Sequence, residues 1–108
     1  MVRNARMEDV KAIYHLLQHF ANKGLLLARS FSALYDQLRD FSVYVEKNGE
    51  DSEDERLIGV VALHICWENL AEIRSLAVID EYQNKGVGKQ LINFLNVAHA
   101  GIAHHFFA

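Results

Sequence analysis

The chain has 108 residues, of which 51% are hydrophobic and 23% charged, and its formal net charge at pH 7 is -3. This size and composition predict a single domain over residues 1–108 and exclude a disordered or fibrous protein. The negative charge argues against a nucleic-acid partner, and no apolar run approaches the roughly 20 residues that span a bilayer, which argues against a membrane partner.

The first half of the chain predicts a short strand followed by two helices. Residues 2–5 favour a strand, and the apolar residues that follow recur at steps of three and four, which predicts an amphipathic helix ending at Gly24. Residues 25–29 are too few to span a membrane and are interpreted as a buried connector. Ser30 is a typical N-cap for a second helix that ends near Asp40.

The middle of the chain predicts three consecutive strands that form a meander. Residues 41–46 alternate apolar and polar side chains, which is typical of a strand with one face inward. Residues 47–56 combine turn residues with dense negative charge, which predicts a solvated hairpin loop. Residues 57–67 and 72–79 are the other two expected strands.

A glycine-containing turn separates the last of these strands from a long helix that is expected to end at Gly101. A helix N-terminus has unpaired N–H groups and the positive end of the helix dipole, so it binds phosphate where glycines allow a close approach. Gly86 and Gly88 allow that approach, although an isolated pair of glycines before a helix is also typical of an ordinary tight strand-to-helix turn. The spacing matches neither the Walker loop nor the dinucleotide-binding fingerprint.

The motif Gln83-x-x-Gly86-x-Gly88 and the order of the elements resemble the GCN5-related N-acetyltransferase (GNAT) superfamily. Residues 24–30 and 70–78 resemble, more specifically, the acetyltransferase domain of N-acetylglutamate synthases and their stand-alone relatives. The resemblance implies an α/β (α+β) fold with a mixed, mainly antiparallel sheet flanked by helices. It implies an acetyl-CoA-dependent enzyme that acetylates the amine of a small molecule, such as the amino acid glutamate. The alternative is a non-catalytic acyl-CoA-binding or protein-interaction module derived from such an enzyme.

The resemblance also implies the residues of the site. Acetyl-CoA is the expected co-substrate, with its pantetheine along the strand before the turn and its pyrophosphate on the turn. The implied contacts are Leu76, Ala77, Val78, Gln83, Asn84, Lys85, Gly86, Val87, Gly88 and Lys89. Glu72 is the implied catalytic base, and its alternative role is a surface carboxylate at a strand end. Arg74 shares a strand face with Glu72 and Arg29 lies in the connector, so each can hold a substrate carboxylate or form a structural ion pair.

The C-terminal end departs from the family pattern. Members normally continue after the long helix with a complete fifth strand, a further helix and two more strands, which include the usual acid tyrosine. Here a fifth strand is expected over residues 102–108, and the chain stops at Ala108. An apolar sheet edge carrying Phe106 and Phe107 predicts a homodimer.

The remaining histidines and the cysteine predict neither a metal centre nor a nucleophile. His15 and His19 are four residues apart but lack a carboxylate partner in the motif. Three others are interpreted as surface or tail residues: His99, His104 and His105. Cys66 is predicted to be an inert core thiol, and a single cysteine without a targeting segment favours the cytoplasm.

Overall fold

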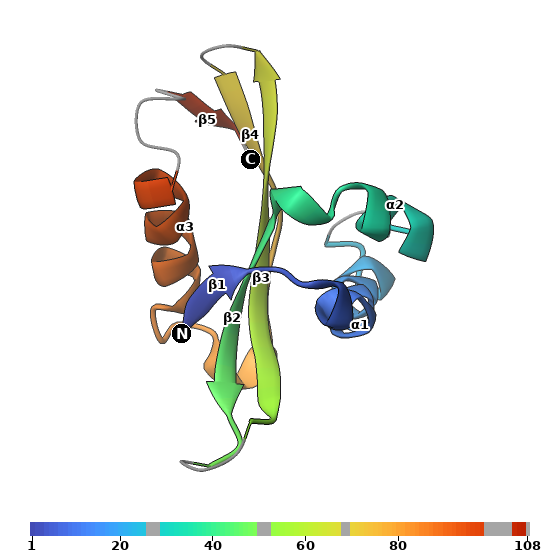
Figure 1. Ribbon diagram of the computed structural model, residues 1–108, viewed down its shortest axis with the longest axis vertical. Helices are drawn as coiled ribbons and strands as arrows, with labels where there is room; N and C mark the ends of the chain where they lie inside the picture. The colour runs from blue at the N-terminus through green and yellow to red at the C-terminus, as the bar shows by residue number, and fades with distance from the viewer. Residues whose placement is uncertain (26–28, 50–52, 68–69, 99–104, 108) are drawn as a thin grey trace.

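The computed structural model describes residues 1–25, 29–49, 53–67, 70–98 and 105–107. Their strands form one sheet in the order β1-β2-β3-β4-β5, antiparallel from β1 to β4 and parallel between β4 and β5 (Figure 1). The strands are β1 Val2–Asn4, β2 Phe41–Lys47, β3 Glu55–Trp67, β4 Leu70–Val78 and β5 His105–Phe107. The helices are α1 Val10–Asn22, α2 Phe31–Asp36 and α3 Val87–Ala98, with short 3-10 helices η1 Met7–Asp9, η2 Leu38–Asp40 and η3 Asp80–Tyr82. This arrangement confirms the predicted fold class.

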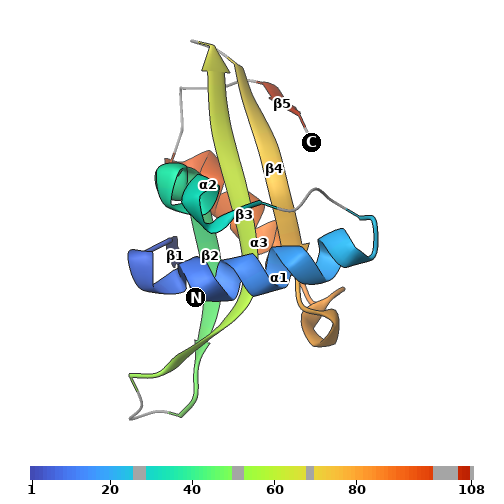
Figure 2. The ribbon, with the colours of Figure 1, turned by 90° about the vertical axis from the view of Figure 1, so that its right-hand side faces the viewer.

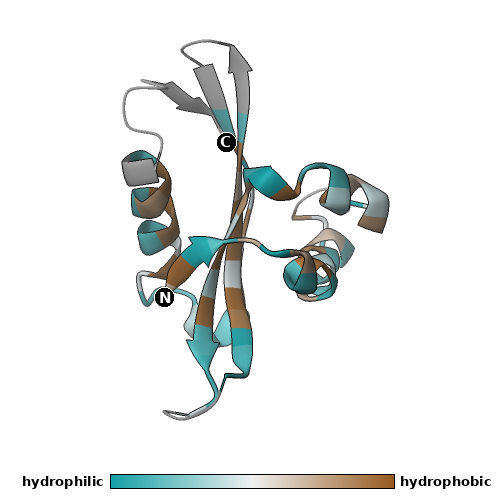
Figure 3. Ribbon diagram, viewed as in Figure 1, coloured by the Kyte–Doolittle hydropathy of each residue, from teal (hydrophilic) through white to brown (hydrophobic). Residues whose placement is uncertain are grey.

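Helices cover both faces of the sheet, with α1 and α2 on one face and α3 on the other (Figures 1 and 2). The hydrophobic residues of the sheet lie between these two layers (Figure 3). One core contains Ile13 and Leu34 from α1 and α2, and the other contains Leu91 and Leu95 from α3. Residues 58–63 of β3 are all buried because this strand is covered on both sides. Within the described ranges, no helix is both long and apolar enough to cross a membrane.

α3 packs directly on the backbone of β3 at Gly59. A Cβ atom at this position would lie 3.2 Å from each of three atoms, which are the carbonyl oxygen of Ala77, Cδ1 of Leu91 and Cγ1 of Val87. The absence of a side chain at Gly59 therefore sets how closely the first turns of α3 approach the sheet. Since the predicted phosphate-binding turn leads straight into α3, this contact also positions that turn.

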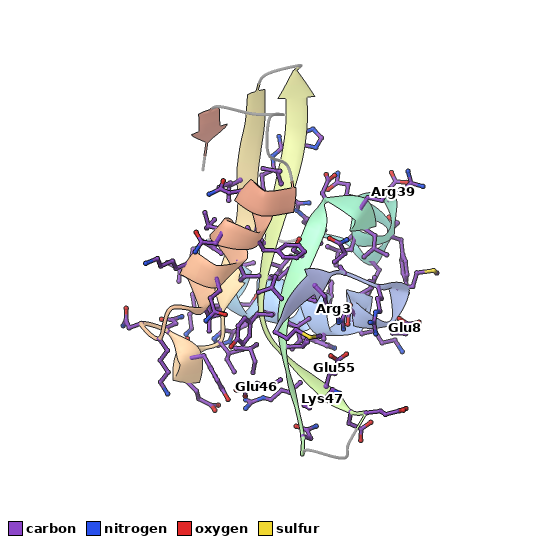
Figure 4. All side chains as sticks on the ribbon, turned by 60° about the vertical axis from the view of Figure 1, so that its left-hand side comes forward. Arg3, Glu8, Arg39, Glu46, Lys47 and Glu55 are labelled. Atoms are coloured by element: carbon purple, nitrogen blue, oxygen red, sulfur yellow. The ribbon has the colours of Figure 1, made fainter. Side chains whose placement is uncertain are left out.

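An ion-pair network joins β1, the start of α1 and β3. Arg3 Nη1 donates to Asp9 Oδ2 at 2.7 Å. Arg3 Nη2 donates to Glu55 Oε1 at 3.1 Å, and Figure 4 labels these two residues. The backbone N–H of Arg6 also donates to Asp9 Oδ2 at 2.7 Å. The hydrogen bond with Asp9 is the main cause that raises the pKa of Arg3. Asp9, at the start of α1, thus anchors the helix to the sheet.

The second helix is shorter than predicted. α2 ends at Asp36, and the chain reaches Asp40 through the separate 3-10 helix η2. The N-cap role of Ser30 is confirmed, because its Oγ accepts a backbone hydrogen bond at 3.2 Å. Leu25 is expected from the sequence to lie in a buried connector, but it is 67% exposed. It directly follows Gly24, whose φ of 72° lies in the left-handed region and changes the chain direction after α1. Residues 26–28 of that connector lie outside the described residues.

The prediction that only one face of residues 41–46 is covered is wrong. Phe41 and Val43 are buried against the α1 side as expected, but Ser42 on the opposite face is only 4% exposed and Tyr44 packs against the α3 core. The cause is α3, which covers the face that the alternation assigned to solvent. The predicted hairpin loop is also shorter than expected, since β3 already begins at Glu55. The predicted environment of Cys66 and the helix end at Gly101 lie outside the described part of the chain.

Candidate functional site

The extended backbone of β4 is interrupted at Ser75, whose φ of 57° lies in the left-handed region. The register with β3 shifts between Arg74 and Ala77, as it does at a β-bulge. β5 pairs only with residues 70–72, so the second half of β4 has no neighbour on its outer edge among the strands that the structure describes. N–H and C=O groups along such an edge can pair with an extended, amide-containing ligand. Three predicted contacts lie on this half: Leu76, Ala77 and Val78.

The chain then forms the predicted turn before α3. Asn84 and Gly86 have φ values of 64° and 85°, which lie in the region that favours glycine. The first turn of α3 closes with a hydrogen bond from the Gln90 N–H to the Gly86 oxygen at 3.0 Å. Gln83 ties the turn back to β4, because its Nε2 donates to the carbonyl oxygen of Val78 at 3.0 Å. The N–H groups at the start of α3 have no partner within the helix and are available to an anion.

A cavity of about 340 Å³ opens beside this turn. Its lining consists of Val78, Tyr82, Gln83, Asn84, Gly86, Val87, Gly88 and Lys89. A Cβ atom at Gly86 or Gly88 would meet no atom within 4 Å, so the space in front of both residues is open. Three of the predicted contacts do not line this cavity. Leu76 and Ala77 precede Val78 on β4, and Lys85 places its Nζ 5.4 Å from the ring centre of Tyr82. Glycines, a helix N-terminus and a lysine therefore surround one cavity that suits a phosphate group.

Tyr82 anchors the turn to the sheet. Its hydroxyl donates to Glu46 of β2, and the guanidinium carbon of Arg56 lies 6.0 Å from its ring centre. The hydrogen bond with Glu46 is the main cause that raises the pKa of Tyr82. Tyr82 therefore holds the turn in place and is poorly suited to give up a proton.

The first half of β4 carries a charged pair on the face that α1 and α2 cover. Arg74 Nη2 donates to Glu72 Oε2 at 2.8 Å, as their spacing on one strand face predicts. This hydrogen bond is the main cause that lowers the pKa of Glu72, so its carboxylate form is favoured. About a third of each side chain is exposed, so the pair is open to solvent.

Arg29 approaches this pair from the segment before α2. Its guanidinium carbon lies 5.2 Å from the ring centre of Phe41, and its Nη1 donates to Gln37. Burial lowers the pKa of Arg29, the positive charge of Arg74 lowers it further, and Asp40 acts in the opposite direction. The structure thus brings together the two arginines that the sequence analysis selected. Guanidinium groups that repel each other in this way form a site where an anion is stabilised.

Sequence reasoning missed two further members of this cluster, His64 and Asp40. His64 Nδ1 lies 3.2 Å from Asp40 Oδ2, and His64 is the direct partner of Glu72 in the β3–β4 ladder. The available signal was the strand register, because His64 and Glu72 are nearly equidistant from the turn between β3 and β4. Glu72, Arg74, Arg29, His64 and Asp40 are called the charged cluster below.

The two histidines of α1, which are the other histidines whose side chains the structure describes, lie apart from this cluster. His19 Nε2 lies 3.6 Å from Asp80 Oδ2, and His15 is exposed on α1. Among the described residues, no group of three or more His, Cys, Asp or Glu side chains is arranged to hold a metal ion. His99 and His104 lie outside the described residues.

Comparisons with known sequences show which family this chain resembles over most of its length. Residues 10–100 match the family model described as "Acetyltransferase (GNAT) family". An uncharacterized N-acetyltransferase of Chlorobaculum tepidum is 40% identical over 91 residues, which cover 84% of this chain and 54% of the relative. An amino-acid acetyltransferase of Mycobacterium tuberculosis is 33% identical over 95 residues, which cover 88% and 52%. The chain thus spans about half the length of these curated relatives.

Two solved structures share the fold over most of this chain. The M. tuberculosis protein Rv2747, in complex with CoA and NLQ, has a TM-score of 0.78 and 32% identity, and the match covers 91% of this chain and 56% of that one. N-acetylglutamate synthase of Neisseria gonorrhoeae, complexed with coenzyme A and N-acetyl-glutamate, has a TM-score of 0.80 and 29% identity. That match covers 94% of this chain and 23% of the synthase.

Proposed function

Because this chain belongs to the acetyltransferase (GNAT) family, we propose that it transfers the acetyl group of acetyl-CoA to the amino group of an amino acid, with glutamate as a candidate. The observation that carries this proposal is the position of β4. Its first half holds Glu72 and Arg74, and its second half, whose outer edge no described strand covers, ends at the cavity beside α3. One strand therefore links a site for a charged acceptor with a site for a phosphate-containing donor.

Acetyl-CoA fits the second half of β4 and the turn. The pyrophosphate is proposed to accept hydrogen bonds from the N–H groups around Gly86 and Gly88, with Lys89 adding positive charge. No acidic residue follows Glu81 in the sequence, so no carboxylate from that part of the chain opposes the phosphates. The pantetheine amides are proposed to pair with the backbone edge at residues 76–78.

The charged cluster fits the two charged groups of an amino acid. Arg74 and Arg29 are proposed to bind the carboxylate, because a guanidinium matches a carboxylate in both charge and geometry. Glu72, which Arg74 keeps ionised, is proposed to attract the ammonium group. The names of the relatives support this class of acceptor, since an amino-acid acetyltransferase and a structure with N-acetyl-glutamate are among them.

Two measurements on the purified protein test this function. Isothermal titration with acetyl-CoA tests donor binding, and thiol release with a panel of amino acids and simple alkylamines tests transfer. We expect saturable binding and faster thiol release with amino acids, glutamate included. Binding without release for any amine supports the non-catalytic acyl-CoA-binding module instead, and absence of binding contradicts both functions.

The single-domain organisation over residues 1–108, the homodimer and the cytoplasmic location stay predictions from the sequence. Sedimentation equilibrium at micromolar concentration tests the homodimer. A monomeric mass under those conditions would contradict it.

A further inference from the structure

We propose that His64, oriented by Asp40, accepts the proton that the acceptor ammonium must lose before its nitrogen attacks the thioester. This inference rests on the proposed function and assigns its proton transfer to a side chain of β3. It gives Glu72 a different task from the one the family resemblance implies. Glu72 holds the ammonium group, and the imidazole takes the proton.

Glu72 is a weak base because of its partner. Arg74 Nη2 donates to Glu72 Oε2 at 2.8 Å, and this contact lowers the pKa of Glu72. A carboxylate with a lowered pKa is ionised at neutral pH but has little affinity for a proton. A group that is less basic is also a less efficient general base. The ion pair with Arg74 therefore makes Glu72 better at binding a cation than at removing a proton from it.

His64 has the arrangement of an oriented imidazole base. Its Nδ1 lies 3.2 Å from Oδ2 of Asp40, which belongs to η2 immediately before β2. A proton on Nδ1 is donated to this carboxylate, which makes Nε2 the nitrogen that takes up the substrate proton. The carboxylate also stabilises the imidazolium that forms. Because 41% of the His64 side chain is exposed, the proton can then pass to water.

The strand register brings the imidazole to the ammonium. His64 and Glu72 are direct partners between β3 and β4, and the Cβ atoms of such partners lie about 4.5–5.5 Å apart. A cation held by Glu72 is therefore next to His64. The charged groups that the described contacts place beside His64 include Asp40 from η2 and Glu72 from β4, and Glu72 is itself hydrogen-bonded to Arg74.

The step balances in protons and electron pairs. The ammonium gives one proton to Nε2 of His64, and the lone pair that this frees forms a C–N bond to the thioester carbonyl carbon. The C–S bond breaks, and its electron pair leaves with sulfur. A second proton from the nitrogen passes to that sulfur, and the imidazolium releases its proton to water. The products are an N-acetyl amino acid, CoA as the thiol and one proton.

The variant His64→Gln tests the inference, since glutamine is polar and of similar size but takes up no proton at neutral pH. We expect kcat with the best amino acid to fall by about 10² to 10⁴-fold, with little change in the Kd for acetyl-CoA. The wild-type profile of kcat against pH should fall on its acidic side, and this acidic limb should be absent in His64→Gln. The matched control is His15→Gln, at an exposed histidine of α1, which should keep both the rate and the limb.

Two further variants separate proton transfer from binding and from folding. Free imidazole should restore part of the activity of His64→Gly, which a loss of structure would not allow. Glu72→Gln should raise the KM of the amino acid and keep the acidic limb. An unchanged limb in His64→Gln, or loss of the limb in Glu72→Gln, overturns the assignment to His64 but not the proposed function. Absence of turnover by the wild type with every amino acid refutes the proposed function and this inference together.

Discussion

The two halves of β4 differ in the chemical groups that they can present to a ligand. The first half offers side chains, namely Glu72 and Arg74, which lie beside β3 and the segment before α2. After the bulge at Ser75, the second half offers a backbone edge that leads to the glycine-containing turn. A backbone site needs correct conformation at a few adjacent residues, whereas a side-chain site needs several distant segments to meet. The two halves should therefore respond to different substitutions.

The second half of β4 and the glycine-containing turn are called the backbone half below, and the first half of β4 with its side chains is called the side-chain half. Gly88→Leu is expected to have the largest effect on substrate binding, because it blocks the backbone half alone. A Cβ atom at Gly88 meets no other atom within 4 Å, so leucine is accommodated in the first turn of α3 while its side chain enters the cavity. We expect the Kd for acetyl-CoA to rise by about 100-fold or more, measured by titration calorimetry. The free energy of unfolding should change by less than about 1 kcal/mol.

Gly86 is a poorer position for that test. Its φ of 85° is strained for any side chain, so a substitution there mixes a loss of stability with a loss of binding. If Gly88→Leu binds acetyl-CoA as tightly as the wild type, the turn does not hold the pyrophosphate.

Arg74→Ala is the matching test of the side-chain half. Loss of a charged hydrogen bond to the substrate carboxylate costs about 1.5–3 kcal/mol, so the KM of the amino acid should rise by about 10 to 100-fold. The Kd for acetyl-CoA should stay the same. Arg74→Lys should give an intermediate KM, because lysine keeps the charge but lacks the planar pair of donors.

Arg39→Ala is the control for the loss of a positive charge in the same neighbourhood. Arg39 is exposed on η2, beside Asp40 in the sequence (Figure 4). Its removal should leave the KM of the amino acid unchanged. A wild-type preference for simple alkylamines over amino acids would contradict the role of Arg74.

The difference between the two halves of β4 also explains why the sequence predicted the turn but missed part of the charged cluster. Gln83, Gly86 and Gly88 lie within six residues, and a turn of this kind depends on local conformation, so its position and shape were predictable. The contact between Glu72 and Arg74 follows from their spacing on one strand. His64 and Asp40 are 24 residues apart, and the pairing of β2 with β3 brings them together. The coverage of β2 on both faces was missed for a similar reason, since α3 comes from a distant part of the chain.

Gly59→Ala tests how far the backbone half depends on packing. Its new Cβ atom would lie 3.2 Å from a carbonyl oxygen and two side chains, so α3 must move slightly away from β3. We expect a loss of about 1–2 kcal/mol in the free energy of unfolding, measured with urea. Because α3 begins at the turn, the Kd for acetyl-CoA should rise several-fold while the KM of the amino acid changes little. An equal effect on both substrates would mean that the two halves do not act independently.

The smallest expected effect comes from comparing two arginine–carboxylate pairs of the same chemistry. The side chains of Arg3 and Asp9 are 12% and 13% exposed, whereas those of Arg74 and Glu72 are 37% and 33% exposed. Burial by itself raises the pKa of Asp9, but the hydrogen bonds from Arg3 and from the Arg6 backbone outweigh it and lower the pKa below its ordinary value of 3.8. A carboxyl group with a lowered pKa in the folded state adds stability that is present above its unfolded pKa and is lost as the pH falls through its folded pKa.

Asp9→Asn should therefore lower the free energy of unfolding at pH 7 by about 1 kcal/mol, once solvent screening of the pair is allowed for. The difference from the wild type should shrink as the pH falls below about 4, because the unfolded wild type then binds a proton at Asp9 while the folded state, with its lowered pKa, still resists protonation. Glu72→Gln should leave the free energy of unfolding nearly unchanged at pH 7, since its pair is open to solvent. Urea unfolding at pH 7 and pH 3 measures all three proteins. If Glu72→Gln destabilises the protein as much as Asp9→Asn does, the Glu72–Arg74 pair supports the fold and is not reserved for the acceptor.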